Sequence, residues 1–263
     1  MEKQRFVRKN KAMYDAARRQ ENKRTRRTVF YVFLFLFVSL IFLAVCVAVF
    51  LNVSEVKING NEKYTYEQII EYVPINIGDN IYAFDSDEIE AQILQNFPYV
   101  GAVEIKRDLP TIVEINITEE TPYYATDLAG DAYIFSSNMK VLECLPDTDN
   151  TKLGLVSLSI NNVRRCIVGS NVEFVSERNN AALMSLYQEF TDNYIEDKIK
   201  SIDFASRFDI SFNYDDRFEV YIGDTDNIDI KIRFLVAIIN ELEPDATGLI
   251  DVSNPQEASF ARS

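Results

Sequence analysis

The sequence predicts an α+β protein in which a single transmembrane helix precedes a β-α-α-β-β unit and a larger β-rich region with two or more helices. Three observations predict this class. An apolar run without any charge fills Val29–Leu51. Short alternating segments typical of strands follow it, interrupted by a few segments with helical periodicity. Hydrophobic residues make up 47% of the chain, which is enough for a buried core.

Charge is distributed unevenly along the chain. Met1–Thr28 contains 11 basic and 3 acidic residues, whereas Asn52–Ser263 contains 16 basic and 38 acidic residues. The positive-inside rule therefore predicts a basic cytoplasmic tail at residues 1–28 and places residues 52–263 outside the cell membrane. The net charge of −14 also argues against a nucleic-acid partner.

The apolar run has the length of a membrane span. Its 23 residues would form a helix of roughly 35 Å, enough to cross a hydrocarbon core of about 30 Å. A buried core helix is usually shorter or has a polar face, and a cleaved signal peptide has an apolar region of about 7–15 residues before a small-residue cleavage site. We therefore predict an uncleaved, single-pass signal anchor at residues 29–51, with the lipid bilayer as its partner.

The next segment has the pattern of a small two-layer unit. Its helix starts are marked by Thr65-x-x-Gln68, which has the form of a capping box, and by Asp85-x-x-Glu88. Gly60 provides a turn that can adopt a positive φ. The predicted strands are Val53–Ile58, Tyr99–Lys106 and Ile112–Thr118, the last with Val113, Ile115 and Ile117 on one face.

The remainder predicts a second, β-rich region. The predicted helices are Arg178–Tyr194, with Tyr194 on its apolar face, and Asp229–Leu242, with Phe234 facing inward. The predicted strands are Tyr123–Thr126, Ala132–Phe135, Val141–Leu145, a run within Leu153–Ile160, a strand starting at Ile202–Phe204, a hairpin over Ile210–Ile222, and Leu249–Val252.

Four sequence stretches carry a family resemblance. They are VSEVKINGN at residues 53–61, FPYVGAVEIKRDLPTIVEINITEETP at 97–122, VYIGDTDNIDIKIRFLVAIINEL at 220–242 and GLIDVSN at 248–254. The first two resemble a POTRA domain, and all four together with the anchor resemble the FtsQ/DivIB family of bacterial cell-division proteins. Glu119-Glu120 departs modestly from the Glu-Arg of many members. The resemblance implies a POTRA domain at 52–121, a β domain at 122–254 and a C-terminal tail at 255–263.

The resemblance implies a non-enzymatic divisome scaffold at the division septum that helps regulate septal peptidoglycan synthesis. Its implied partners are FtsL-like and DivIC/FtsB-like single-pass proteins and the septal peptidoglycan synthesis machinery. A partner strand would add to an exposed sheet edge. In this chain that edge would consist of Asp251, Val252, Ser253, Asn254, Gln256, Glu257, Ala258, Ser259 and Phe260. Pro255 interrupts this stretch, and a frayed chain end is the alternative. The POTRA segment would offer a second edge, at Ile112–Thr118 or Val53–Ile58.

No catalytic, cofactor or metal site is predicted. The chain has no His, which excludes a Ser-His-Asp triad, a Cys-His dyad and His-ligated zinc. The acidic group Asp224/Asp226/Asp229 lacks the spacing of an EF-hand. Two alternatives stay open, a membrane-anchored cell-wall hydrolase and a POTRA-type chaperone in protein translocation, and Cys144 and Cys166 could pair or remain free.

Overall fold

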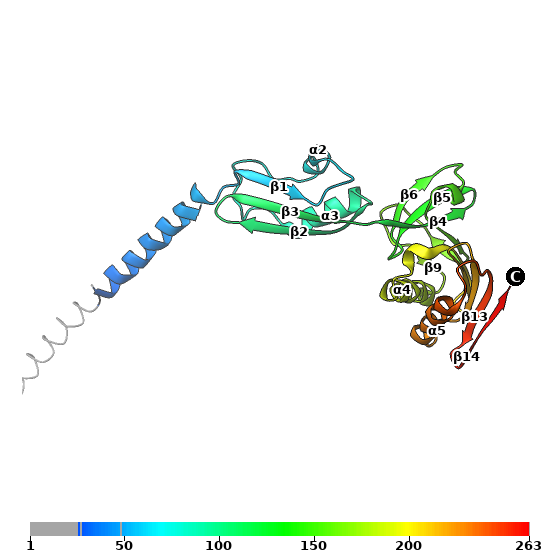
Figure 1. The fold of residues 1–263 in the computed structure, drawn as a ribbon. Coiled ribbons are helices and arrows are strands. Elements are labelled where there is room, and N and C mark those ends of the chain that lie inside the picture. Colours follow the sequence, from blue (N-terminus) through cyan, green and yellow to red (C-terminus); the bar gives the residue numbers. More distant parts are fainter. Residues whose placement is uncertain (1–25, 27, 48, 263) are drawn as a thin grey trace, which may run out of the picture. The chain divides into compact units, whose positions relative to one another are not determined.

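The computed structural model describes residue 26, residues 28–47 and residues 49–262 (Figure 1). The predicted basic tail at 1–28 therefore lies almost wholly outside the described residues. The chain forms two compact units. The first takes in the described residues within Met1–Lys57, together with Ile75–Asp85 and Lys106–Glu114, and the second takes in Ile58–Pro74, Ser86–Ile105 and the described residues within Ile115–Ser263.

An apolar helix opens the described chain. Thr28–Val47 is a 20-residue helix with a mean hydropathy of 2.9, and its side chains are almost all exposed. Val49 and Phe50 are also helical. A helix of this length and composition is able to cross a membrane, which agrees with the predicted transmembrane helix.

A three-stranded sheet with two helices follows. Along the chain its elements are β1 (Glu55–Asn59), α2 (Tyr66–Ile70), α3 (Ser86–Asn96), β2 (Val100–Asp108) and β3 (Ile112–Glu119). The strand order β1-β3-β2 confirms the predicted β-α-α-β-β unit. Because β3 is the central strand, Ile112–Thr118 is not a sheet edge, and that part of the prediction is wrong.

Two local sequence signals of this unit act as expected. The backbone N–H of Gln68 donates to Thr65 Oγ1 at 3.3 Å, and the N–H of Thr65 donates to Gln68 Oε1 at 2.9 Å, which completes the capping box. Gly60 has a φ of +79°, and a Cβ there would lie 2.1 Å from the carbonyl oxygen of Ile117. Only glycine therefore allows the chain after β1 to pass so close to β3.

The second half of the chain forms a nine-stranded sheet of order β14-β13-β12-β11-β10-β7-β4-β5-β6. Its strands are β4 (Pro122–Leu128), β5 (Asp131–Ser136), β6 (Val141–Leu145), β7 (Val156–Ile160), β10 (Ile199–Ser206), β11 (Asp209–Tyr214), β12 (Phe218–Gly223), β13 (Gly248–Asn254) and β14 (Glu257–Arg262). β8 (Val163–Arg165) and β9 (Glu173–Phe174) form a separate ribbon that the sequence did not predict.

Two helices serve as crossovers in this sheet. α4 (Glu177–Asp192) lies in the connection between the parallel strands β7 and β10, and α5 (Ile228–Glu241) joins the parallel strands β12 and β13. Parallel neighbours need such long connections, because a tight turn can join only antiparallel strands. Figure 1 shows both helices beside the sheet. Their buried side chains share one core with the strands, in which the Phe190 and Phe212 rings lie 5.0 Å apart.

Two inward-facing predictions are wrong. Tyr194 is 89% exposed, because α4 ends at Asp192 and Tyr194 follows it with a positive φ of 57°. Phe234 is 37% exposed. The buried face of α5 is instead formed by Ile228, Lys231, Ile232 and Leu235, so a buried lysine helps to set the rotation of the helix.

Candidate partner-binding edge

The last two strands form one edge of the nine-stranded sheet. β13 and β14 are antiparallel, with Ile250 opposite Phe260 and Asp251 opposite Ser259. Pro255, which the sequence showed only as an interruption of the strand, lies in the turn between them. A frayed chain end is not what the structure shows for Glu257–Arg262. Among the described residues, no strand pairs with the outer side of β14, so its backbone groups there are open to another chain.

The opposite edge of the same sheet is partly covered. The N–H of Val141 in β6 donates to the carbonyl of Ser170 at 2.9 Å, and the carbonyl of Val141 accepts from Gly169 at 2.8 Å. Lys140 also forms an isolated bridge with Asn171. Segment 169–171 thus occupies backbone groups that an added strand would need, which makes β14 the more accessible edge.

The nine predicted partner residues divide between the core and the surface. Val252 is fully buried, and Ala258 and Phe260 are partly buried against the core, with the Phe260 ring 6.0 Å from that of Phe218. Asp251 and Ser253 are partly exposed on the other face of β13. The exposed members are Asn254, Gln256, Glu257 and Ser259. Ala261 and Arg262 complete β14, although the prediction stopped at Phe260.

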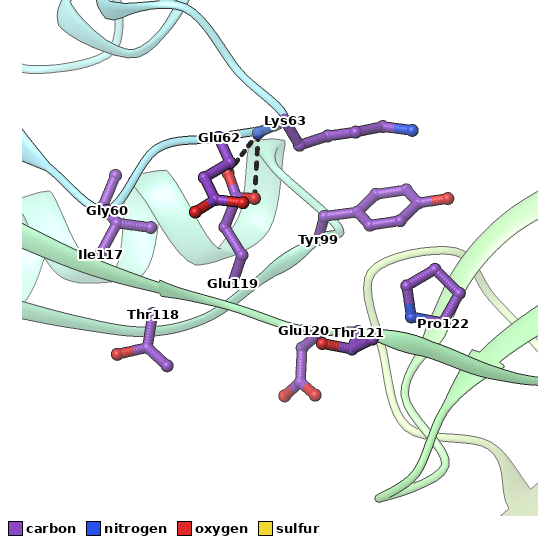
Figure 2. A pocket seen from close by; sticks show the side chains of 10 residues that line it. All are labelled: Gly60, Glu62, Lys63, Tyr99, Ile117, Thr118, Glu119, Glu120, Thr121 and Pro122. Atoms are coloured by element: carbon purple, nitrogen blue, oxygen red, sulfur yellow. Dashed lines mark hydrogen bonds between the residues drawn. The ribbon is translucent and has the colours of Figure 1, made fainter. Parts of the chain in front are cut away.

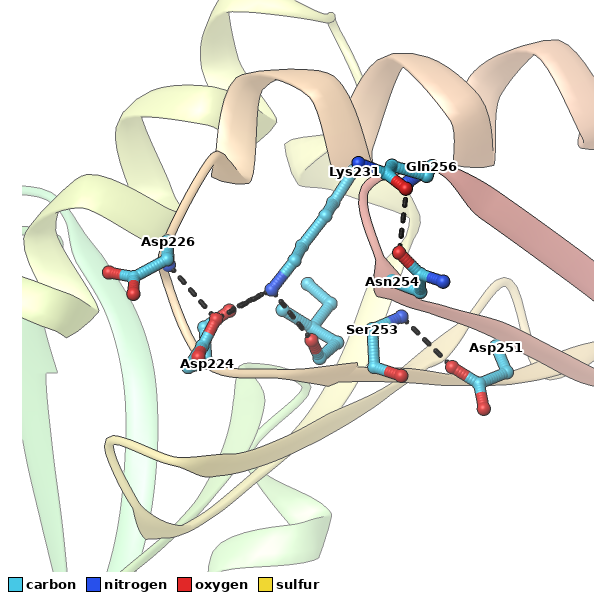
Figure 3. A network of polar contacts seen from close by, with 8 residues as sticks. Asp224, Asp226, Lys231, Asp251, Ser253, Asn254 and Gln256 are labelled. Carbon is cyan, nitrogen blue, oxygen red and sulfur yellow. Dashed lines mark hydrogen bonds and ion pairs between the residues drawn. The ribbon is translucent and has the colours of Figure 1, made fainter.

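Hydrogen bonds within the chain hold the β13–β14 turn in place (Figure 3). The N–H of Ser253 donates to Asp251 Oδ1 at 2.9 Å, and the N–H of Gln256 donates to Asn254 Oδ1 at 3.0 Å. Such short-range bonds from a backbone N–H to an Asp or Asn side chain stabilise turns. The turn is therefore defined by its own sequence and needs no partner to form.

A buried lysine joins the end of β12 to the start of α5. Lys231 is 1% exposed, and its Nζ donates to Asp224 Oδ1 at 2.7 Å, to the Asp224 carbonyl at 2.9 Å and to the Ile222 carbonyl at 3.2 Å. The three donors of the ammonium thus have three acceptors, which offsets the cost of burying a charge. The burial of Lys231 was not predicted from the sequence.

The carboxyl group of Asp224 responds to this contact. The hydrogen bond from Lys231 lowers the pKa of Asp224 below its ordinary value of 3.8, against the opposing effect of burial. The Asp224 side chain is 39% exposed, so water screens part of this interaction. Because the charged form is favoured in the folded state, its contribution to stability is complete above the ordinary pKa and is lost as the pH falls through the folded value.

An Asp224→Asn variant should therefore show a pH-dependent defect. We expect it to be less stable than the original chain at neutral pH, and the difference should narrow as the pH falls below 3.8. Hydrogen exchange of the β12 and α5 amides measures this difference locally. Asp226→Asn is the matched control, since Asp226 is exposed and contacts Asp224 only through its backbone N–H at 3.1 Å. An equal pH response in both variants would contradict the assignment.

An open hollow of about 640 Å³ lies beside the end of β3 (Figure 2). Glu119 in this hollow accepts hydrogen bonds from the Lys63 backbone N–H at 2.9 and 3.0 Å, and the Lys63 ammonium lies 4.3 Å from the Tyr99 ring centroid. Glu120 accepts from Asn138 Nδ2 at 2.9 Å. Burial, and then a hydrogen bond to Glu143, raises the pKa of Tyr99. The carboxylates of Glu119 and Glu120 are thus already engaged by the chain itself.

Two tyrosines and two cysteines outside the edge take structural or surface positions. Tyr64 and Tyr72 pack edge-on against Phe97, at centroid distances of 4.8 and 5.3 Å. Cys144 and Cys166 are both free thiols, and burial raises the pKa of Cys166 to about 11. Within the described part of the chain, no group of three or more Cys, Asp or Glu side chains is arranged to hold a metal ion.

Comparisons with known proteins agree with this architecture. Residues 51–120 match the family described as "POTRA domain, FtsQ-type". The chain is 26% identical over 234 residues to the cell division protein DivIB of Clostridium botulinum, covering 88% of this chain and 90% of the relative. It is also 26% identical over 211 residues to DivIB of Clostridium tetani, covering 78% and 77%.

A third relative is similar over a shorter region. The DivIB protein of Bacillus subtilis is 31% identical over 106 residues, which covers 38% of each chain. The relatives named here are all described as cell division proteins. Together with the POTRA match, they confirm the resemblance to the FtsQ/DivIB family and support a role in cell division.

Proposed function

We propose that this chain serves bacterial division as a membrane-anchored binding scaffold. The proposal is based on its match to an FtsQ-type POTRA domain and on its similarity, over most of its length, to the DivIB cell-division proteins. Its apolar helix would hold it in the cell membrane at the septum, with the folded units outside. It would bind other single-pass division proteins of the FtsL and DivIC/FtsB kinds and thereby help regulate septal peptidoglycan synthesis. Its action would be binding and not catalysis.

The open outer side of β14 is the observation that carries this proposal. An extended partner segment could add there as a tenth strand, with affinity from backbone hydrogen bonds and selectivity from alternate side chains. Ser259 and Glu257 are exposed on β14 and would contribute to that selectivity. The hydrogen bonds of the turn and the Phe260–Phe218 contact order β14 in the absence of a partner. This preorganisation reduces the conformational entropy lost on binding.

A photo-crosslinking amino acid at Ser259 should capture a second division protein in dividing cells. The full chain is expressed with the probe at Ser259 or, as a control, at Tyr194, which is 89% exposed but distant from β14 in the sequence and outside the strands. Crosslinks from Ser259 and not from Tyr194, identified by mass spectrometry, support strand addition at β14. Equal adducts at both positions, or none at Ser259, would count against it.

The division role is tested separately by depletion. Cells that lose the chain should fail to form septa, and a fluorescently tagged copy should concentrate at the septum. Normal septation together with a uniform membrane signal would overturn the role in division, whatever the crosslinking shows.

A further inference from the structure

A loop of the first unit is hydrogen-bonded to the end of the apolar helix. The Ile81 N–H donates to the Leu51 carbonyl at 2.8 Å, and the Gly78 N–H donates to the Val53 carbonyl at 2.7 Å. The Asn80 side chain reaches farther back, where its Nδ2 donates to the Val47 carbonyl at 3.3 Å. Loop 77–82 is therefore held within hydrogen-bond distance of the last turn of the helix.

The β2–β3 turn joins the same end of this unit. The Ser54 N–H donates to the Thr111 carbonyl at 2.8 Å, and the hydroxyl of Ser54 donates to that of Thr111 at 2.9 Å. Arg107 then ties β2 to the loop, because its Nε donates to the Ile81 carbonyl at 2.9 Å and its Nη2 to the Phe84 carbonyl at 3.2 Å. Loop 77–82 and the β2–β3 turn are therefore joined by hydrogen bonds at this end of the unit.

Three large apolar side chains are exposed at this end. Ile77 is 69% exposed, Tyr82 is 56% exposed and Leu109 is 54% exposed. Each lies one or two residues from a backbone group that is bonded to residues 51–54. Water is a poor solvent for such side chains, so their positions near the end of a membrane-type helix favour an apolar environment.

The geometry points to the lipid–water interface as that environment: we infer that Ile77, Tyr82 and Leu109 insert into the bilayer where the span ends. The helix Thr28–Val47 is roughly 30 Å long, which matches a hydrocarbon core of about 30 Å, and each headgroup layer adds about 5–7 Å. Leu51 must then lie in or next to one headgroup layer, and the loop bonded to it lies there too. Tyr side chains are enriched at this depth.

The charged side chains near Ile77, Tyr82 and Leu109 favour an apolar contact with lipid over an electrostatic one. Asp108 is exposed, and the Asp79 carboxylate accepts hydrogen bonds from the backbone N–H of Asn76 at 2.8 Å and from its side-chain nitrogen at 3.2 Å. Arg107 is engaged by the carbonyls of the loop. Because carboxylates are repelled by anionic lipid, the contact is apolar and needs no anionic headgroup.

The chain contains no Trp, so a single introduced indole reports on one position. Full-length Tyr82→Trp is reconstituted into phosphatidylcholine vesicles, with or without brominated acyl chains. We expect blue-shifted emission and about twofold or greater quenching by bromine, because an indole at the interface contacts acyl chains. Tyr194→Trp is the matched control. Its emission should stay at the wavelength of a water-exposed indole, and brominated acyl chains should not quench it. Leu109→Trp repeats the test at the other connection.

The inference rests on membrane anchoring, which belongs to the proposed function, and flotation of the vesicles tests that anchoring separately. Variants that float with the vesicles while the Tyr82→Trp and Leu109→Trp indoles stay water-exposed would overturn the lipid contact and leave the anchor intact. The lipid contact would also be overturned if the blue shift appeared only after a division protein was added and brominated lipid caused no quenching. That result would assign the surface to the added protein.

Discussion

Replacing Gly248 by alanine should detach β14 from the sheet. Gly248 has a φ of +155°, and a Cβ there would lie 2.1 Å from the carbonyl oxygen of Ala261 and 2.9 Å from the Phe260 ring. A backbone oxygen cannot move away unless the strand moves, so the clash adds to the cost of an unfavourable φ. We expect a local loss of about 2–4 kcal/mol. Faster hydrogen exchange in Glu257–Arg262, with loss of crosslinks from Ser259, measures it.

Gly154→Ala separates the two causes. Gly154 also has a positive φ, of +71°, but a Cβ there would meet no atom within 4 Å. This control carries the backbone cost of about 1 kcal/mol without the clash and lies outside the β13–β14 hairpin. If Gly248→Ala and Gly154→Ala leave the exchange of β14 equally unchanged, the close approach of β14 to Gly248 does not hold the edge.

Replacing Lys231 by methionine should be the other large perturbation. Methionine fills a similar volume but leaves the Ile222 and Asp224 carbonyls and the Asp224 carboxylate without their donor. Removal of one partner from a buried pair costs about 3–5 kcal/mol. The 39% exposure of Asp224 allows water to replace part of the lost contact, so we expect about 2–3 kcal/mol. Exchange of the β12, α5 and β13 amides should increase together.

Lys200→Met is the control for loss of positive charge. Lys200 is exposed on β10, and a surface substitution of this kind usually changes stability by less than about 0.5 kcal/mol. A defect of the same size in both variants would mean that the change in net charge, and not the buried contact, destabilises the domain. The double variant Asp224→Asn/Lys231→Met then shows whether the two residues act as a pair, because coupled losses do not add.

Short-range patterns predicted the elements well where polar and apolar residues alternate cleanly. β3 lies where its alternation placed it, with Val113, Ile115 and Ile117 buried, and α2 begins at the capping box that the sequence predicted. The predictions that Tyr194 and Phe234 face inward were wrong, because helical spacing indicates that a helix has an apolar face but not how the helix is rotated against the core or at which residue it ends. In the folded chain, the left-handed backbone at Tyr194 follows the end of α4, and the buried contact of Lys231 helps to set the rotation of α5.

The sequence by itself determined the apolar helix, the charge difference across it, the α+β class and the resemblance to the FtsQ/DivIB proteins, because each depends on composition or on patterns between neighbouring residues. Only the tertiary structure decided which strands are edges, since strand order depends on contacts between distant segments. It placed β3 in the centre of its sheet, added β14 beyond β13, and brought loop 77–82 to the end of the apolar helix. The two surfaces proposed for a partner and for lipid follow from that long-range pairing, which no local pattern in the sequence encodes.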